Sequence, residues 1–297
     1  MFEYYSLYIV AILINSVNTV FLFKKIQLAA GATLWANTVF LIINGIVSAI
    51  VPALILIVRG EDLQLTPYSF WVSIIIVSCS ALDTIARMKA YSKGKIATVN
   101  VLGSIGPIIL SCAWGILVLH ETLSILGAIA IGIMLLSAVL IRDEENDRTV
   151  KGLLWLYITV IVASSAVSIL SKQHQVEKRF TTVDPLSFSI WIGLIRTVLF
   201  TVVAAVHLTR LGTGTVHFPK TAVIYSAAFS AVSAGCYIIT LITGAVLPIV
   251  ITSPLGTGLS IIMCTLLPWL IYREKLNKKQ IAGVCCSLIG AILFLVG

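Results

Sequence analysis

The stretch ATVNVLGSIGPIILSCAWGILVLHETLSILGAIAIGIMLLSAVL, residues 97–140, decides the fold because it occurs again, in diverged form, as residues 250–293. At a constant offset of 153 residues and without a gap, the two stretches share ten identical residues. Each copy is a long apolar span, a short polar break with a glutamate, and another apolar span. Apolar segments match one another easily, so the shared polar Glu-x-Leu at Glu121 and Glu274 is the most informative part of the match. The chain therefore carries a duplicated set of apolar spans.

The composition indicates a protein that lies in a lipid bilayer. The 297-residue chain is 59% hydrophobic and 11% charged, whereas a soluble domain carries about 25% charged residues. Apolar segments of about 18 or more residues follow one another, and in lipid each must satisfy its own backbone, so each is expected to be a helix. The net charge of +8 comes from basic residues in short loops, where membrane orientation accounts for them and no nucleic acid is indicated. We therefore expect an all-α integral membrane protein.

The apolar runs predict ten transmembrane helices. They cover roughly residues 4–23, 31–58, 68–91, 96–119, 123–141, 152–173, 185–208, 220–243, 245–271 and 280–296. The polar connecting loop 142–151 separates a first five-helix repeat, 1–141, from a second, 152–297. Because five is odd, the second half enters the membrane from the opposite side, so the repeats are expected to be inverted. Such repeats are typical of secondary transporters.

Lysine and arginine are distributed unevenly between the two predicted sides of the membrane. The loops after the odd-numbered spans hold fifteen of these residues, and the other side holds four, Lys172 among them. The positive-inside rule places the richer side in the cytoplasm. We therefore expect both termini outside, and the expected location is the plasma (inner) membrane of a bacterium.

Short motifs support this layout. The polar breaks read LHETLS at 119–124 and YREKLN at 272–277, each between the last two spans of a half. The first span carries Asn15-Ser16-Val17-Asn18 and is followed by Lys24. In these residues and in its layout the chain resembles the drug/metabolite transporter superfamily, and within it the ten-span metabolite exporters. The resemblance implies a carrier with alternating access, whose halves line a central cavity for a small molecule.

Two ionisable residues within the predicted spans stand out, because charge in the membrane is costly and often functional. Asp83 either binds a proton or cation, or forms a structural ion pair with Arg87 one helical turn on. Arg196 cannot lose its charge. It either clamps a substrate carboxylate or phosphate, or bonds carbonyl groups of a neighbouring helix or Asp83.

Other candidates have structural alternatives. Glu121 and Glu274 are expected to cap the N-terminus of the next helix rather than to act in coupling or gating. Helix breakers at 103–107, with Asn100 one turn before, and at 252–258, with Ser253, predict broken helices that line a site, although small residues also serve tight packing.

Further polar and aromatic side chains deep in the spans could complete a cavity, or could be packing and interhelical bonds. They are Asn15, Asn18, Asn37, Asn44, Trp114, Trp191, Tyr225 and Tyr237.

The leading hypothesis is a secondary carrier of a small polar metabolite or drug, with a proton as a candidate coupling ion. One acid and one base inside the membrane favour a zwitterion such as an amino acid. No catalytic residue, metal or cofactor is expected. The alternatives are a membrane enzyme acting on lipid-linked substrates, disfavoured because the four histidines are scattered singly, and a non-transporting scaffold or receptor, disfavoured by the inverted duplication.

Overall fold

The computed structural model describes residues 2–31, 33–93, 96–141, 154–211, 218–272 and 277–296, and within these ranges every regular element is a helix. Side chains are described for the same residues except 88–105, 141, 154, 210, 211, 268, 272, 295 and 296. The predicted polar loop 142–151 and Glu274 lie outside the described residues.

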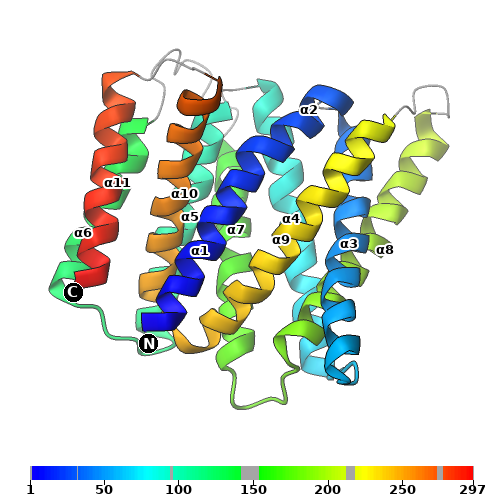
Figure 1. Ribbon diagram of the computed structural model, residues 1–297, viewed down its shortest axis with the longest axis horizontal. Helices are drawn as coiled ribbons and strands as arrows, with labels where there is room; N and C mark the ends of the chain where they lie inside the picture. The colour runs from blue at the N-terminus through cyan, green and yellow to red at the C-terminus, as the bar shows by residue number, and fades with distance from the viewer. Residues whose placement is uncertain are drawn as a thin grey trace. The chain divides into compact units, whose positions relative to one another are not determined.

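The helices follow the apolar runs of the sequence (Figure 1). They are α1 (Phe2–Asn18), the π-helical η1 (Thr19–Phe23), α2 (Lys24–Ala30), α3 (Leu34–Arg59), α4 (Pro67–Lys93), α5 (Ile96–Leu117), α6 (Ile125–Ile141), α7 (Leu154–Val176), α8 (Pro185–Leu211), α9 (Lys220–Val246), α10 (Ile249–Tyr272) and α11 (Lys278–Val296). Each predicted span overlaps one of these helices, the first of them as a continuous run through α1, η1 and α2.

Local signals determine where several helices begin and end. The Thr33 hydroxyl accepts a hydrogen bond from the Ala36 amide at 3.1 Å and so caps α3. Gly60, at a φ of 67°, ends the same helix in the left-handed conformation that glycine tolerates. Asp184 caps α8 by accepting from the amides of Leu186 and Ser187, at 2.9 and 3.1 Å. These caps satisfy amides that a helix end leaves unpaired.

Among the described residues, seven helices are long and apolar enough to cross a membrane. Their outward faces carry large apolar side chains, such as Val58 and Val198, with exposed fractions of 87% and 64%. Contiguous exposed apolar surface of this extent is what lipid would cover. The structure is therefore that of an α-helical protein suited to a bilayer.

The chain folds into two compact units. Unit 1 comprises Met1–Leu13, Ser78–Gln173 and Thr243–Gly297, and unit 2 comprises Ile14–Val77 and His174–Ile242. Each unit takes segments from both predicted halves, because packing defines the units whereas sequence similarity defines the repeats. The division of the chain into two five-helix repeats, 1–141 and 152–297, stays a prediction.

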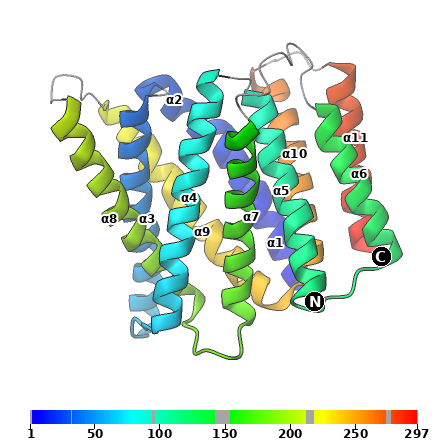
Figure 2. The ribbon, with the colours of Figure 1, turned by 180° about the vertical axis from the view of Figure 1, so that it is seen from behind.

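In unit 1, α6 and α11 lie side by side, as both ribbon views show (Figures 1 and 2). The hydroxyls of Ser137 and Ser287, both fully buried, share a hydrogen bond of 2.7 Å between these helices. Met134 and Leu255 belong to the apolar core of the unit and are fully buried. The core thus joins residues that are more than a hundred positions apart.

In unit 2, α3 and α8 pack through small residues (Figure 2). A Cβ atom added to Gly45 would come within 2.8 Å of the Thr197 amide nitrogen, and one added to Gly193 within 2.7 Å of the Ala49 nitrogen. The backbones therefore approach more closely than larger side chains allow, which is how helices associate in lipid.

The prediction that prolines break two helices is wrong. Helix α5 continues through Pro107, and α10 continues through Pro254. Pro254 leaves the Val250 carbonyl without its helical donor, and the Cys112 thiol donates to that carbonyl at 3.6 Å. In α5, a Cβ atom on Gly106 would come within 2.7 Å of the Ile161 carbonyl oxygen of α7, so this glycine serves close packing.

Candidate functional site

A polar stripe runs along α9 in unit 2. Ser226, Ser230, Ser233 and Tyr237 follow one another at spacings of four, three and four residues, which places them on one face of a helix. Ser226 and Ser230 are fully buried. A polar face inside an apolar unit needs hydrogen-bond partners from neighbouring helices.

Arg196 of α8 reaches this stripe through an oriented chain of hydrogen bonds. Its Nη1 donates to Asn44 Oδ1 of α3 at 2.6 Å, and Asn44 Nδ2 donates to Ser230 Oγ at 3.1 Å. The Ser230 hydroxyl then donates to the Ser226 carbonyl at 2.7 Å. A guanidinium has no acceptor, so the amide oxygen of Asn44 must face it. All three hydrogen bonds therefore run in the same direction, from Arg196 toward Ser226.

Asn15 and Asn18 of α1 meet the same stripe one turn further along. Asn18 Nδ2 donates to the Phe229 carbonyl at 2.9 Å and to Ser233 Oγ at 3.0 Å. The Ser233 hydroxyl donates to Asn15 Oδ1 at 3.1 Å. The π-helical η1 starts directly after Asn18, and π segments within α-helices often mark functional positions. Unit 2 thus gathers three of the predicted site residues, Asn15, Asn18 and Arg196, and Tyr237 lies within electrostatic range of Arg196.

Unpaired polar atoms concentrate in this cluster. Of the five buried side-chain polar atoms without a partner among the described residues, three are Asn18 Oδ1, Arg196 Nε and Ser226 Oγ. Buried polar atoms are nearly always paired, so each exception calls for an explanation. Three of the exceptions therefore mark this cluster as the candidate site.

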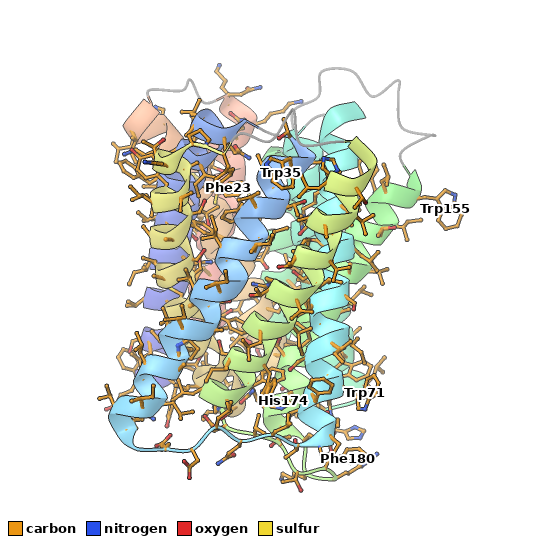
Figure 3. All side chains as sticks on the ribbon, turned by 90° about the vertical axis from the view of Figure 1, so that its right-hand side faces the viewer. Phe23, Trp35, Trp71, Trp155, His174 and Phe180 are labelled. Atoms are coloured by element: carbon orange, nitrogen blue, oxygen red, sulfur yellow. The ribbon has the colours of Figure 1, made fainter. Side chains whose placement is uncertain are left out.

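An aromatic cluster lies next to the polar stripe in unit 2. The rings of Phe23, Phe40 and Phe229 have centroids 5.5 to 5.8 Å apart. Figure 3 shows Phe23 and Trp35 toward one end of their helices and His174 toward the other. The aromatic cluster gives η1, α3 and α9 a common apolar contact.

Unit 1 contains a different charged group at the turn between α9 and α10. The Lys172 ammonium donates to the carbonyls of Gly244 and Leu247, at 2.7 and 2.6 Å. Glu121 accepts from the amides of Ile249 and Val250, both at 3.0 Å. Lys172 Nζ lies 3.7 Å from Glu121 Oε1, and the side chains are only 8% and 14% exposed. We call these two residues the turn clamp.

The turn clamp corrects one prediction. Glu121 caps a helix as expected, but the helix is α10, 128 residues away, rather than the next one, α6. Ser124 performs the local role for α6 and accepts from the Gly127 amide at 3.0 Å. Lys172, near the end of the predicted span 152–173, is 9% exposed and neutralises the C-terminal end of α9.

Asp83 forms the structural ion pair that was one of its two predicted roles. Both of its carboxylate oxygens accept from Arg87 Nε, at 2.9 and 2.8 Å. The side chains of Arg87 and Asp83 are 23% and 20% exposed. Asp83 therefore has its counter-charge within unit 1.

The remaining predicted site residues with described side chains have partners outside the polar stripe. Trp191 donates from Nε1 to the Gln64 carbonyl at 2.9 Å, and Asn37 donates to the Thr33 carbonyl of its own helix at 3.0 Å. The Lys25 ammonium lies 5.5 Å from the Tyr225 ring centroid.

In unit 1, Trp114 Nε1 donates to Gln173 Oε1 at 3.2 Å, and Ser253 Oγ donates to the Pro107 carbonyl at 2.8 Å. The Asn100 side chain lies outside the described residues. None of these contacts brings the residues into the cluster around Arg196.

In the sequence His174 stands apart from the other histidines. In the structure it is buried in a hydrogen-bond network. Its Nε2 lies 2.8 Å from Ser69 Oγ, and its Nδ1 lies 3.0 Å from Gln175 Nε2. The ring stacks on Phe188 with centroids 3.6 Å apart. Ser69 and His174 are both fully buried, and an amide rather than a carboxylate faces Nδ1, so this pair is a packing feature and not an accessible nucleophile.

The three serines of the stripe were not among the residues predicted from the sequence. Their spacing was visible there, but serine is common where transmembrane helices pack, so the spacing alone does not single them out. Asn44 was noticed only as one of several polar residues, and its partner Arg196 is 152 residues away.

Comparison with known proteins identifies the fold. Twenty-eight chains of solved structures match, and one of them, described only as the crystal structure of a protein, superimposes with a TM-score of 0.79 over 99% of this chain and 98% of its own. At 14% sequence identity, that likeness shows the fold alone. No model of a protein family and no curated protein matches the sequence.

Proposed function

We propose that the chain is a secondary carrier that moves a small polar solute by alternating access. In this proposal all ten helical runs cross the bilayer as two inverted five-helix repeats. Both termini face outward, the membrane is a bacterial plasma membrane, and the relation to the drug/metabolite transporters stays an inference from the short motifs.

The helix bounds support the duplication. The starts of α4 and α9, at Pro67 and Lys220, differ by 153 residues. The starts of α6 and α11, at Ile125 and Lys278, differ by the same number. The offset found in the sequence therefore recurs in two pairs of helices.

The single observation that carries the proposal is that helices equivalent under this offset run antiparallel to each other. Ser137 bonds Ser287 between α6 and α11, and a Cβ atom on Gly290 would contact Met134 across the same pair. The offset of 153 converts the first contact into the second, because 137 becomes 290 and 287 becomes 134. A two-fold axis perpendicular to the helices produces this exchange, and in a bilayer such an axis lies in the membrane plane.

Unit 2 supports the same relation independently. Gly45 lies against Thr197, and Ala49 lies against Gly193, so residue numbers rise along α3 as they fall along α8. The starts of α3 and α8 differ by 151 residues. Arg196 and its partner Asn44 differ by 152 residues, one fewer than the offset of the sequence match, so the proposed two-fold relation puts them at nearly equivalent positions of the two halves. Inverted-repeat transporters bind their substrate at such an interface between repeats.

Transport is tested by reconstituting the purified protein into proteoliposomes. Vesicles loaded with unlabelled solute are diluted into trace labelled solute, across a panel of amino acids, sugars and quaternary amines. A carrier exchanges at least one solute in a saturable, trans-stimulated manner, and an imposed pH gradient shows whether protons drive it. A scaffold or receptor gives no such flux with any solute, and that result would overturn the proposal.

A further inference from the structure

Most N–H donors of the Arg196 guanidinium have no acceptor among the described residues. Among the described residues it makes one hydrogen bond, from Nη1 to Asn44, and its Nε has no partner although that atom is fully buried. A guanidinium carries five N–H donors. Among the described side chains, the ion pairs join other residues and none gives Arg196 a carboxylate.

One edge of the guanidinium has no acceptor among the described residues. Nη1 is on the side of Cδ, whereas Nε–H and one N–H of Nη2 point in the same direction on the other side. That pair of parallel donors is the edge that matches the two oxygens of a carboxylate. Nε lies buried in the protein, whereas the residue as a whole is half-buried.

Asn44 holds the edge in place. Since Asn44 is fixed by Ser230, and Ser230 by the Ser226 carbonyl, the guanidinium is tethered at Nη1 while its other edge stays unused. An arginine held only for structure would gain more from carbonyls on both edges. Asn44 is therefore a positioning residue.

We propose that the Nε and Nη2 edge of Arg196 binds the carboxylate of a substrate that carries one such group. The inference rests on the proposed carrier function and names the class of its substrate. The argument for a zwitterion used Asp83 as the site for the amine, but Asp83 is paired with Arg87, so the carboxylate is the part of the substrate that the structure still supports.

The charge balance favours a carboxylate over a phosphate. The other basic residues of unit 2 with described side chains lie near helix ends or in connections: Lys24, Lys25, Arg59, Lys178, Arg179 and Lys220. One guanidinium neutralises one carboxylate. A phosphate dianion would keep an uncompensated charge in an apolar unit, which is costly.

The experiment measures binding to the purified full-length protein in detergent, by ligand-dependent thermal shift titration. The probes are carboxylates paired with their amides: acetate and acetamide, L-lactate and L-lactamide, L-leucine and L-leucinamide. Inorganic phosphate forms a separate arm. In the wild type, at least one carboxylate is expected to bind about tenfold or more tightly than its amide.

Arg196→Gln removes the charge and should bring carboxylate and amide to within about twofold of each other. Arg196→Lys keeps the charge without the fork and should retain part of the preference, which also covers the case in which the glutamine variant fails to fold. Arg59→Gln is the matched control, because it removes an exposed arginine from the end of α3, and its preference should equal that of the wild type.

The proposal is overturned if no carboxylate is preferred over its amide, if the preference survives Arg196→Gln, or if phosphate binds as tightly as the best carboxylate. Failure here is separable from failure of the carrier. Proteoliposomes that exchange amides or cations without a carboxylate preference retain the carrier and reject the Arg196 site. Arg196-dependent carboxylate binding without any flux retains the Arg196 site and rejects the carrier.

Discussion

Lys172 in unit 1 and Arg196 in unit 2 are both cations within apolar helices, but only Lys172 has a carboxylate beside it. Lys172 donates to two carbonyls and lies 3.7 Å from Glu121, so it has both hydrogen-bond acceptors and a counter-charge. Arg196 has one amide partner and a buried Nε without any. A charge that is neutralised within the protein serves the fold, whereas one left open is suited to an external anion.

The largest expected effect comes from breaking the turn clamp. Lys172→Met leaves the Glu121 carboxylate buried without its counter-charge and the Gly244 and Leu247 carbonyls without a donor, so the free energy of unfolding should fall by about 3–5 kcal/mol. Unfolding of the detergent-solubilised protein measures it, with the exposed Lys178→Met as control.

The double variant Lys172→Met/Glu121→Gln sharpens this test. It removes both charges, so it should be less destabilised than the sum of the two single variants. Strict additivity would mean that Lys172 and Glu121 do not act as a pair.

The second effect is on ligand binding rather than on stability. Arg196→Gln removes one charged hydrogen bond, so the unfolding free energy should change by no more than about 1–2 kcal/mol, while carboxylate affinity falls about tenfold or more. Both quantities come from one thermal titration. A loss of stability as large as that of Lys172→Met would make Arg196 a structural cation and remove the contrast between the two units.

A third variant would give Arg196 an internal counter-charge, as Lys172 has. Asn44→Asp places a carboxylate 2.6 Å from the position of Arg196 Nη1, so Arg196 gains an internal counter-ion. Stability should rise by about 1 kcal/mol, and carboxylate binding should decline because the added charge neutralises the guanidinium. Unchanged binding would show that the charge of Arg196 does not attract the ligand. Asn44→Ser is the neutral comparison.

The smallest effect is expected at Asp83. It already pairs with Arg87 one helical turn away and is partly exposed, so Asp83→Asn should cost about 0.5 kcal/mol and leave exchange of solute in proteoliposomes unchanged. Loss of pH-driven uptake in this variant, with exchange intact, would instead make Asp83 the coupling carboxylate.

The helices were predictable because apolar runs and polar breaks are local features of the sequence. The partners of the charged residues were not. Glu121 caps α10, whose start is 128 residues further along the chain, and no spacing rule predicts such a partner. Lys172 was placed at the end of a predicted span, but its contacts with Glu121, Gly244 and Leu247 could not be read from the sequence. The expected break at Pro254 does not occur, and the Cys112 thiol donates to the Val250 carbonyl that this proline leaves free. For Asp83 the local i,i+4 rule predicted the correct partner.

The candidate site shows the same division. The spacing of Ser226, Ser230 and Ser233 is visible in the sequence, and so is the charge of Arg196. Only the fold reveals that α9 presents those serines to Asn44 and that Asn44 takes a single edge of the guanidinium. In the proposed repeat, Asn44 and Arg196 lie at nearly equivalent positions, with asparagine in one half and arginine in the other.

The most direct test of the proposed carboxylate carrier is trans-stimulated exchange of a carboxylate substrate in proteoliposomes that contain wild-type, Arg196→Gln or Arg59→Gln protein at equal density. We expect saturable exchange by wild type and Arg59→Gln. At subsaturating substrate, the exchange rate of Arg196→Gln should be at most about one tenth of the wild-type rate. Equal exchange by all three proteins, or no exchange by the wild type, would contradict the proposal.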